Sequence, residues 1–357
     1  MKGLSFLNRF IPKKKQRIVL YANLGFRDNV KALYDYLVRH HFQEQYEIVC
    51  VSNDFYALKR LPGVRYVNLY VGVYYFFTSK YFFYCFGKYP IKPARQQVVV
   101  NLWHGMPLKK IGNLIEENQD KDYNYFTYLV ATSPFFAEVM QRCFKAQPEQ
   151  MLLVGNVRND ELTEFPMANR IIWMPTYRND GKQLETAALG LPFSLSEADF
   201  LMLDAELLQQ NKQLYIKLHP LEQTPLRLPD NCQAIHLMTD GELSQQGQSL
   251  YQFLGTTCAL LTDYSSVFLD YLLLDRPIGF TVDDLMSYSQ NRGFIFEEMS
   301  PFLVGPHITD LSGLLAFVQG IEQDAHRVKR QQLNQQVNTI QTNFCQTLLQ
   351  QIGLSND

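Results

Sequence analysis

Several apolar runs of this 357-residue sequence end in polar side chains that can move a proton or bind a phosphate. His104 follows the run QVVVNLW, and Gly105 behind it allows a tight turn. A histidine at the end of a buried strand can accept a proton near neutral pH. A structural histidine bonded within the turn is the alternative. The Trp-His-Gly context and the lysines at 109 and 110 favour a chemical role.

A lysine and a second histidine end another apolar run, LYIKLHP. Side chains two positions apart on a strand point the same way, so Lys217 and His219 can form one cationic clamp for a phosphate. The alternative is a surface lysine beside a structural histidine, and the motif alone does not decide between them.

The densest polar segment is LLTDYSSVFLD, in which an apolar strand runs into a helix at Ser265 and Ser266. Free N–H groups, hydroxyls and the helix dipole at such a start form an anion site suited to a diphosphate. Asp270 lies one turn further and is placed to bind a ribose hydroxyl. An ordinary helix cap is the alternative, but it needs fewer polar residues than this run provides.

Two arginines also follow predicted strands. Arg158 lies in GNVRND and Arg178 in PTYRND, and the planar guanidinium suits phosphate recognition. The sequence contains no P-loop, GxSxG, HExxH or DxD-type metal motif. Asp283-Asp284 is the acidic pair most similar to such a metal motif, and we interpret it as a loop contact rather than as a metal site. We therefore expect neither a bound metal nor a cofactor.

Alternating strands and helices must position these side chains. The apolar runs favour parallel sheets that are covered on both faces, and the pattern restarts near Arg170. We predict an α/β protein with two Rossmann-like domains facing a central cleft, where ligands bind beyond the carboxyl ends of the strands. The expected boundaries are 1–165 for the first domain, 166–325 for the second, and 326–357 for a C-terminal helix that packs back on the first.

The bulk composition excludes some classes of protein. Hydrophobic residues make up 46% and charged residues 19%, which is typical of a globular chain. The formal charge of -2 gives no reason to expect nucleic-acid binding. The six cysteines form no CxxC pair, so we expect no zinc site and a reducing compartment.

Two segments bear on membrane contact. The aromatic run 71–86 contains Lys80 and is too short to span a bilayer. The N-terminus, MKGLSFLNRFIPKKKQR, is too short for a signal peptide. It has two equally supported interpretations: a basic amphipathic segment on an anionic membrane surface, or a simple lead-in to the first strand.

The set and order of these motifs resemble the CDP-glycerol glycerophosphotransferase family, the polyol-phosphate transferases of teichoic acid and related capsule synthesis. The resemblance runs from about Ile18 to Pro306. The matching segments are WHGMPLKKIG (103–112), TSPFFAEVM (132–140), GNVRND (155–160), MPTYRND (174–180), KLHP (217–220), LTDYSSVFLDYLLLDRPIGF (261–280), RGF (292–294) and GP (305–306).

The resemblance implies a GT-B fold whose first domain takes the acceptor and whose second takes a CDP-polyol. It implies transfer of a polyol phosphate to a glycan or lipid-linked hydroxyl, at the cytoplasmic face of the membrane. His104 would be the general base, and Lys217 with His219 would hold the diphosphate. The CDP-polyol contacts it implies are Trp103, Gly105, Met106, Pro107, Arg158, Pro175, Thr176, Arg178, Lys217, Asp263, Ser265, Ser266 and Asp270.

Three positions depart from the family pattern. Met106 stands where the family usually has Thr, Asn156-Val157 where it has Tyr-Pro, and Tyr177 where it has Trp. Met106 neighbours the expected base, so the polyol or acceptor is expected to differ there. Two other functions stay open: a GT-B glycosyltransferase that uses a nucleotide sugar, and a non-catalytic scaffold of an envelope-polysaccharide complex.

Overall fold

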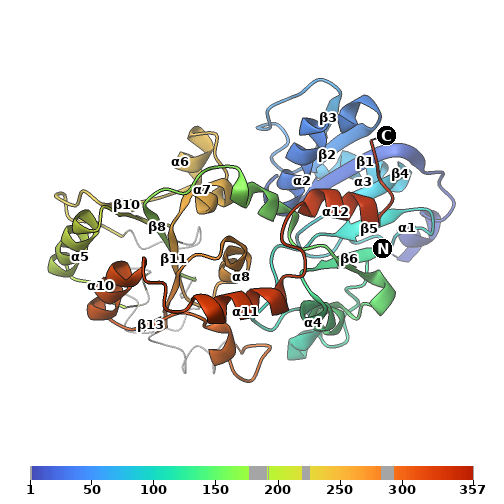
Figure 1. Ribbon diagram of the computed structural model, residues 1–357. Coiled ribbons are helices and arrows are strands. Elements are labelled where there is room, and N and C mark those ends of the chain that lie inside the picture. The colour runs from blue at the N-terminus through green and yellow to red at the C-terminus, as the bar shows by residue number, and fades with distance from the viewer. Residues whose placement is uncertain (1, 177–190, 192, 219–225, 283–292, 357) are drawn as a thin grey trace. The chain divides into compact units, whose positions relative to one another are not determined.

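The computed structural model describes residues 2–176, 191, 193–218, 226–282 and 293–356 (Figure 1). The chain forms two compact units. The first comprises Met1–Met106, Ile111–Asp160 and Gln336–Asp357, and the second comprises Pro107–Lys110 and Glu161–Gln335. The expected division at 165 lies a few residues beyond this boundary. No feature of the sequence predicted that Pro107–Lys110 belongs to the second unit.

The first unit is built on a seven-stranded parallel sheet with the order β3-β2-β1-β4-β5-β6-β7. Its first six strands follow the doubly wound order, in which the winding direction changes between the first and the fourth strand. Ile18 of β1 pairs with Ile48 and Tyr81, and the sheet centre is fully buried. The strands are β1 (Lys14–Ala22), β2 (Glu47–Ser52), β3 (Val64–Val67), β4 (Ser79–Tyr84), β5 (Val98–Asn101), β6 (Tyr128–Ala131) and β7 (Met151–Leu153).

The α-helices assigned wholly to this unit are α1 (Lys2–Leu7), α2 (Asp28–Arg39), α3 (Leu69–Thr78), α4 (Pro134–Phe144) and α12 (Phe344–Gln351). The Ser133 side chain caps α4 by accepting a hydrogen bond from the Phe136 N–H. The aromatic run 71–86, to which the sequence assigned no element, contains most of α3 and all of β4. The Asn68 side chain accepts from the Val71 N–H and so fixes the start of α3.

The second unit contains a six-stranded parallel sheet with the order β10-β9-β8-β11-β12-β13, which is again the doubly wound order. Trp173 and Phe200 are buried in its core. The strands are β8 (Arg170–Met174), β9 (Gln213–Ile216), β10 (Ile235–Leu237), β11 (Ala259–Thr262), β12 (Ile278–Thr281) and β13 (His307–Ile308). The described helices of this unit are α5 (Glu197–Gln209), α6 (Asp240–Gln245), α7 (Leu250–Thr256), α8 (Val267–Tyr271) and α10 (Leu311–Gly320). A further helix, α11 (Arg327–Val337), begins in this unit and ends in the first, which resumes at Gln336.

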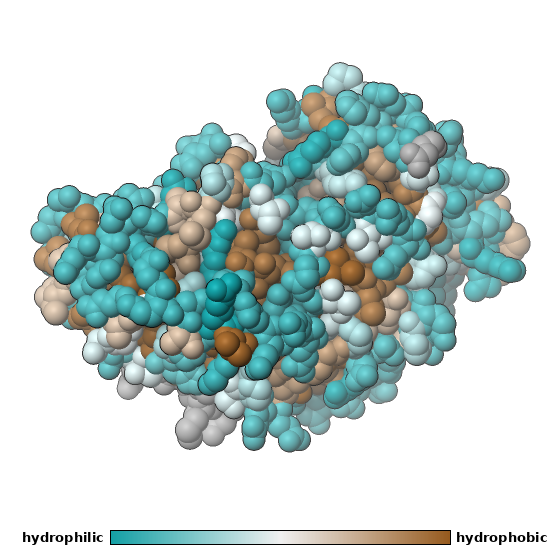
Figure 2. Space-filling view, in the orientation of Figure 1, coloured by the Kyte–Doolittle hydropathy of each residue, from teal (hydrophilic) through white to brown (hydrophobic). Residues whose placement is uncertain are grey.

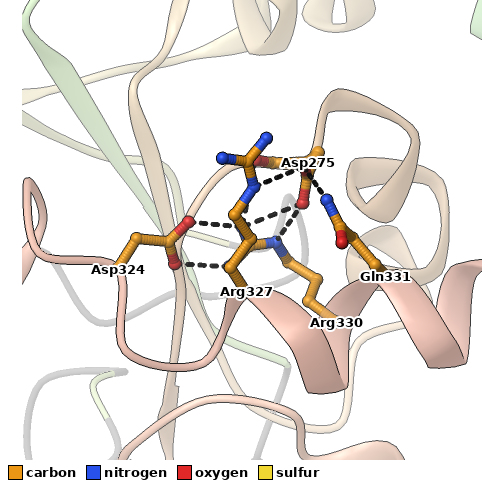
Figure 3. Close-up of polar contacts among 5 residues, drawn as sticks. All are labelled: Asp275, Asp324, Arg327, Arg330 and Gln331. Atoms are coloured by element: carbon orange, nitrogen blue, oxygen red, sulfur yellow. Dashed lines mark hydrogen bonds and ion pairs between the residues drawn. The ribbon is translucent and has the colours of Figure 1, made fainter.

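A charged cluster fastens α11 to the second unit. Figure 3 shows Arg330 beside Asp324 and Asp275, with Arg327 and Gln331 also reaching Asp275. Arg330 is fully buried, and its guanidinium lies 2.6 Å from Asp324 and 3.0 Å from Asp275. The pKa of Arg330 is raised despite its burial, because both carboxylates stabilise the charged form.

The chain then returns to the first unit. The Thr132 hydroxyl donates to the Val337 carbonyl at 2.6 Å. The backbone N–H groups of Phe344 and Cys345 donate to the Asp160 carboxylate at 2.8 and 2.9 Å, at the start of α12. The end of the chain therefore completes the first unit.

The surface and the thiols complete the description. Hydrophilic residues cover most of the face drawn in Figure 2. Within the described ranges, no helix combines the length and the apolar character needed to cross a membrane. All six cysteines are free thiols, and five of them are buried.

Candidate active site

The predicted site residues gather at the carboxyl ends of both sheets, next to the points where the winding changes. In the first unit they follow β5 and β7, and in the second they follow β8, β9 and β11. Ligands of doubly wound proteins bind at this edge.

His104 lies in a turn with an unusual backbone. Trp103 before it has φ +53° and Gly105 behind it has φ +119°, both in the region that L-residues disfavour. The His104 Nδ1 atom is 3.0 Å from the Cys85 carbonyl oxygen at the end of β4. Because a carbonyl only accepts hydrogen bonds, Nδ1 carries a proton. In the neutral ring Nε2 is then the free base.

Two aromatic rings lie against this imidazole. The Trp103 centroid is 4.2 Å from that of His104, and the Phe86 centroid is 5.3 Å away. Burial lowers the pKa of His104 below its usual value, although the Cys85 carbonyl and the Asp28 charge oppose this and Arg158 adds to it. The ring is therefore held in the neutral form that can accept a proton at pH 7.

A polar network connects this turn to the start of α2. Asn29 is fully buried; its Nδ2 donates to the Trp103 carbonyl at 2.9 Å, and its Oδ1 accepts from the Arg158 N–H at 3.0 Å. The Arg158 guanidinium forms an ion pair of 2.6 Å with Asp28. The sequence singled out Arg158 but missed Asp28 and Asn29 as site residues. Their position directly after the first strand of a doubly wound sheet was the available signal.

In the second unit, the fully buried Asp263 connects the predicted segment that contains it with the one that contains Thr176. The Thr176 N–H donates to both Asp263 carboxylate oxygens, at 2.9 and 3.1 Å, and the Thr176 hydroxyl donates at 3.0 Å. The Thr262 hydroxyl also donates to the Met174 carbonyl. The loops after β8 and β11 are thus fixed to each other. Pro175 precedes Thr176 in this arrangement.

The two serines lie where the sequence placed them. Ser265 and Ser266 are half-buried and directly precede α8, which begins at Val267. The side chain of Ser266 makes no capping hydrogen bond to α8. Tyr264, beside them, is buried against Phe294, with 5.4 Å between the ring centroids. These positions agree with the predicted start of a helix, and phosphate binding there stays a prediction.

Asp270 and Lys217 are both buried, and each binds another side chain of the second unit. Asp270 accepts a hydrogen bond of 2.6 Å from the Tyr251 hydroxyl on α7. The Lys217 ammonium lies 3.0 Å from an Asp240 carboxylate oxygen at the start of α6. Their predicted contacts with a ribose hydroxyl and a diphosphate stay predictions.

The WHGMPLKK motif is divided between the units. Trp103–Met106 belongs to the first unit and Pro107–Lys110 to the second, where the Ile295 N–H donates to the Leu108 carbonyl at 2.8 Å. Met106 and Pro107 are both buried. His219, Arg178, Tyr177 and the pair Asp283-Asp284 lie outside the described residues. Within the described part of the chain, no group of three or more His, Cys, Asp or Glu is placed to hold a metal ion.

Comparison with known proteins shows the family and the fold of this chain. The family model described as CDP-glycerol:poly(glycerophosphate) glycerophosphotransferase matches residues 4–346. The teichoic acid ribitol-phosphate primase of Bacillus spizizenii is 27% identical over 68% of this chain and 64% of its own length. The teichoic acid glycerol-phosphate transferase of Staphylococcus aureus is 26% identical over 84% and 82%. A structure of a variant of the wall teichoic acid polymerase TagF matches with a TM-score of 0.77 at 20% identity, over 96% of this chain and 88% of that one.

Proposed function

Because the chain belongs to the CDP-glycerol:poly(glycerophosphate) glycerophosphotransferase family, we propose that it transfers glycerol phosphate, or a related polyol phosphate, from a CDP-polyol to an acceptor. The acceptor is a hydroxyl of a cell-envelope glycan or of a lipid-linked precursor, and the second product is CMP. The observation that carries this proposal is the neutral, aromatic-flanked His104 with Nε2 as its free base.

The reaction is a substitution at the distal phosphorus of the donor. The acceptor oxygen forms a bond to that phosphorus, and its proton passes to His104 Nε2. The bond between the distal phosphorus and the bridging oxygen breaks, and CMP leaves with the electron pair. Positioning and electrostatic stabilisation supply most of the rate in transfers of this kind.

The donor is assigned to the second unit. Asp263 fixes the loop of Pro175 and Thr176, and the pair Ser265-Ser266 precedes α8 next to it. These groups support a site for the CDP moiety, with Lys217, His219 and Arg178 as the cations for its phosphates. In this proposal the two units form a GT-B arrangement in which donor and acceptor meet.

The decisive experiment measures CMP release from CDP-glycerol and CDP-ribitol by the wild type and by His104→Gln. UDP- and CMP-sugars serve as competing donors. We expect CDP-polyol turnover by the wild type and its loss in His104→Gln, with CDP-glycerol binding kept within about threefold. Consumption of a nucleotide sugar without CDP-polyol turnover would refute the proposal in favour of a glycosyltransferase. Unchanged function in His104→Gln would favour a scaffold.

The absence of a metal or cofactor requirement stays a proposal, and it rests on the motifs of the sequence. It is tested by dialysing the enzyme against a chelator and assaying it with and without added Mg²⁺. Equal CMP release in both assays is the expected result. A requirement for the cation would overturn it.

We also propose that the protein acts at the cytoplasmic face of the membrane. The supporting residues lie in and after α1, where Phe6, Leu7 and Phe10 are exposed and the basic residues Lys14 and Lys15 follow. Such a segment suits an anionic surface. Deletion of residues 2–15 should reduce co-sedimentation with anionic liposomes at low salt. Unchanged co-sedimentation would exclude this segment as the anchor.

A further inference from the structure

Arg27 is an exposed cation held beside the proposed base, and the function proposed above gives it no role. It directly precedes α2, and its guanidinium carbon lies 5.6 Å from the centre of the Phe86 ring. That ring is in turn 5.3 Å from the imidazole of His104. The two distances together limit the separation of the Arg27 guanidinium from the His104 ring to about 11 Å.

The charges around Arg27 are already engaged, whereas Arg27 itself has no ion-pair partner among the described residues. Asp28 forms its 2.6 Å ion pair with Arg158. Lys31, one turn along α2, pairs with Asp35. Asp54, on the neighbouring loop, accepts hydrogen bonds from the Phe26 N–H and the Ser52 hydroxyl. Arg27 therefore offers a cation that the fold itself leaves available.

Contact with an aromatic face holds an arginine without consuming its hydrogen-bond donors. The ring quadrupole attracts the cation, while the N–H groups around the edge of the guanidinium stay free to bind a second group. A phosphodiester matches this donor set, because two of its oxygens can accept parallel N–H bonds.

The family description already contains a poly(glycerophosphate), and we propose that Arg27 is the residue that recognises the phosphate of such an acceptor. This inference rests on the proposed function, in which His104 receives the proton of that hydroxyl. A glycerol phosphate separates its free hydroxyl oxygen from its phosphorus by roughly 6 Å. Hydrogen bonds of about 2.8 Å at the two ends extend its reach to about 12 Å, which covers the separation of at most about 11 Å between His104 and Arg27. The hydroxyl then reaches the imidazole while the phosphate reaches the guanidinium.

Two soluble acceptors test this directly: glycerophosphoglycerol, which contains the phosphodiester, and diglycerol, which has an ether in its place. With CDP-glycerol as donor, the wild type should show a kcat/KM at least tenfold higher for glycerophosphoglycerol. Arg27→Gln should remove that preference through KM, and Arg27→Lys should restore part of it. Arg39→Gln is the matched control, because it removes an arginine from the far end of the same helix and should keep the preference.

Acceptor binding without donor separates this inference from the proposed function. Titration calorimetry should show glycerophosphoglycerol binding to the wild type more tightly than diglycerol, and Arg27→Gln should abolish the difference. Equal affinities in the wild type, or an equal loss for both acceptors in Arg27→Gln, would overturn the role of Arg27. Phosphate-dependent binding without any CMP release would instead overturn the proposed transfer and leave the role of Arg27 standing.

Discussion

The side-chain amide of Asn29 donates a hydrogen bond of 2.9 Å to the backbone carbonyl of Trp103, which lies 74 positions later in the chain. Trp103 has a left-handed backbone, with φ +53°, and His104 follows it. A non-glycine residue in that conformation costs about 1–3 kcal/mol and persists only where its surroundings fix it. Asn29 is one of those fixing groups, and the orientation of His104 depends on it.

Replacement of Asn29 by Ala should therefore lower both stability and activity. It leaves the buried Trp103 carbonyl and the Arg158 N–H without their present partner, at a cost of about 1–3 kcal/mol for each unsatisfied group. Urea unfolding measures the first effect, and kcat well below the melting temperature measures the second. Asn124→Ala is the control, because that side chain bonds the Lys145 carbonyl in the same unit. A fall in kcat of similar size in both variants would contradict a specific role for Asn29.

The pH dependence of kcat/KM should follow the protonation of His104. Burial lowers its pKa from the usual 6.5, so its neutral form predominates at pH 7 and activity falls only as the pH drops through that lowered pKa. The Asp28 charge acts against this lowering of the His104 pKa. Asp28→Asn should therefore move the acidic limb of the kcat/KM profile to still lower pH. Profiles of kcat/KM from pH 4.5 to 8 measure the shift. Asp35→Asn on the same helix should leave the limb in place, and movement of the limb to higher pH in Asp28→Asn would refute the assignment.

Substitution of Asp263 should weaken donor binding. An Asn in its place keeps one acceptor oxygen, whereas the Asp263 carboxylate receives three hydrogen bonds from Thr176. We expect the Kd for CDP-glycerol to rise roughly tenfold, equivalent to about 1.4 kcal/mol. Asp204→Asn is the control in the same unit, since Asp204 also accepts from backbone N–H groups, those of Gln233 and Ala234. Calorimetry showing the same weakening in Asp204→Asn would attribute the effect to general destabilisation.

The buried cluster of α11 should contribute to stability alone. Arg330→Met leaves Asp275 and Asp324 without their buried cation and should cost about 3–5 kcal/mol. Arg327→Met removes an exposed partner of Asp275 and should cost no more than about 1 kcal/mol. Urea unfolding of both variants measures the difference. Comparable losses would show that burial does not set the strength of these pairs.

Periodicity predicted the elements best where one pattern was unambiguous. The apolar strand expected before Asp263 is β11, which ends at Thr262, and the helix expected at Ser265 and Ser266 is α8, which begins at Val267. Periodicity did not predict α3 and β4, because aromatic residues follow one another through both the helix and the strand. A run that is apolar at nearly every position carries no period that separates a helix from a strand.

Contacts within the candidate site could be predicted where the topology alone brings the residues together. Thr176 and Asp263 follow strands that pair side by side, so their proximity follows from the topology. Asn29 acts through Trp103 and Arg158, which lie 74 and 129 positions away. No local pattern encodes such a partner. The sequence therefore made His104 a candidate, but it did not predict the hydrogen bond from Asn29 to the residue before it.

The division of the chain has a consequence for how this protein can be cut or exchanged. The polypeptide passes from one unit to the other four times, after Met106, Lys110, Asp160 and Gln335. No single break yields one complete unit per fragment, since the first unit also needs residues from the C-terminal end. Neither unit can therefore be exchanged as one continuous segment of the chain. A gene fusion that swaps the N-terminal half would carry the segment 107–110 with it and leave 336–357 behind.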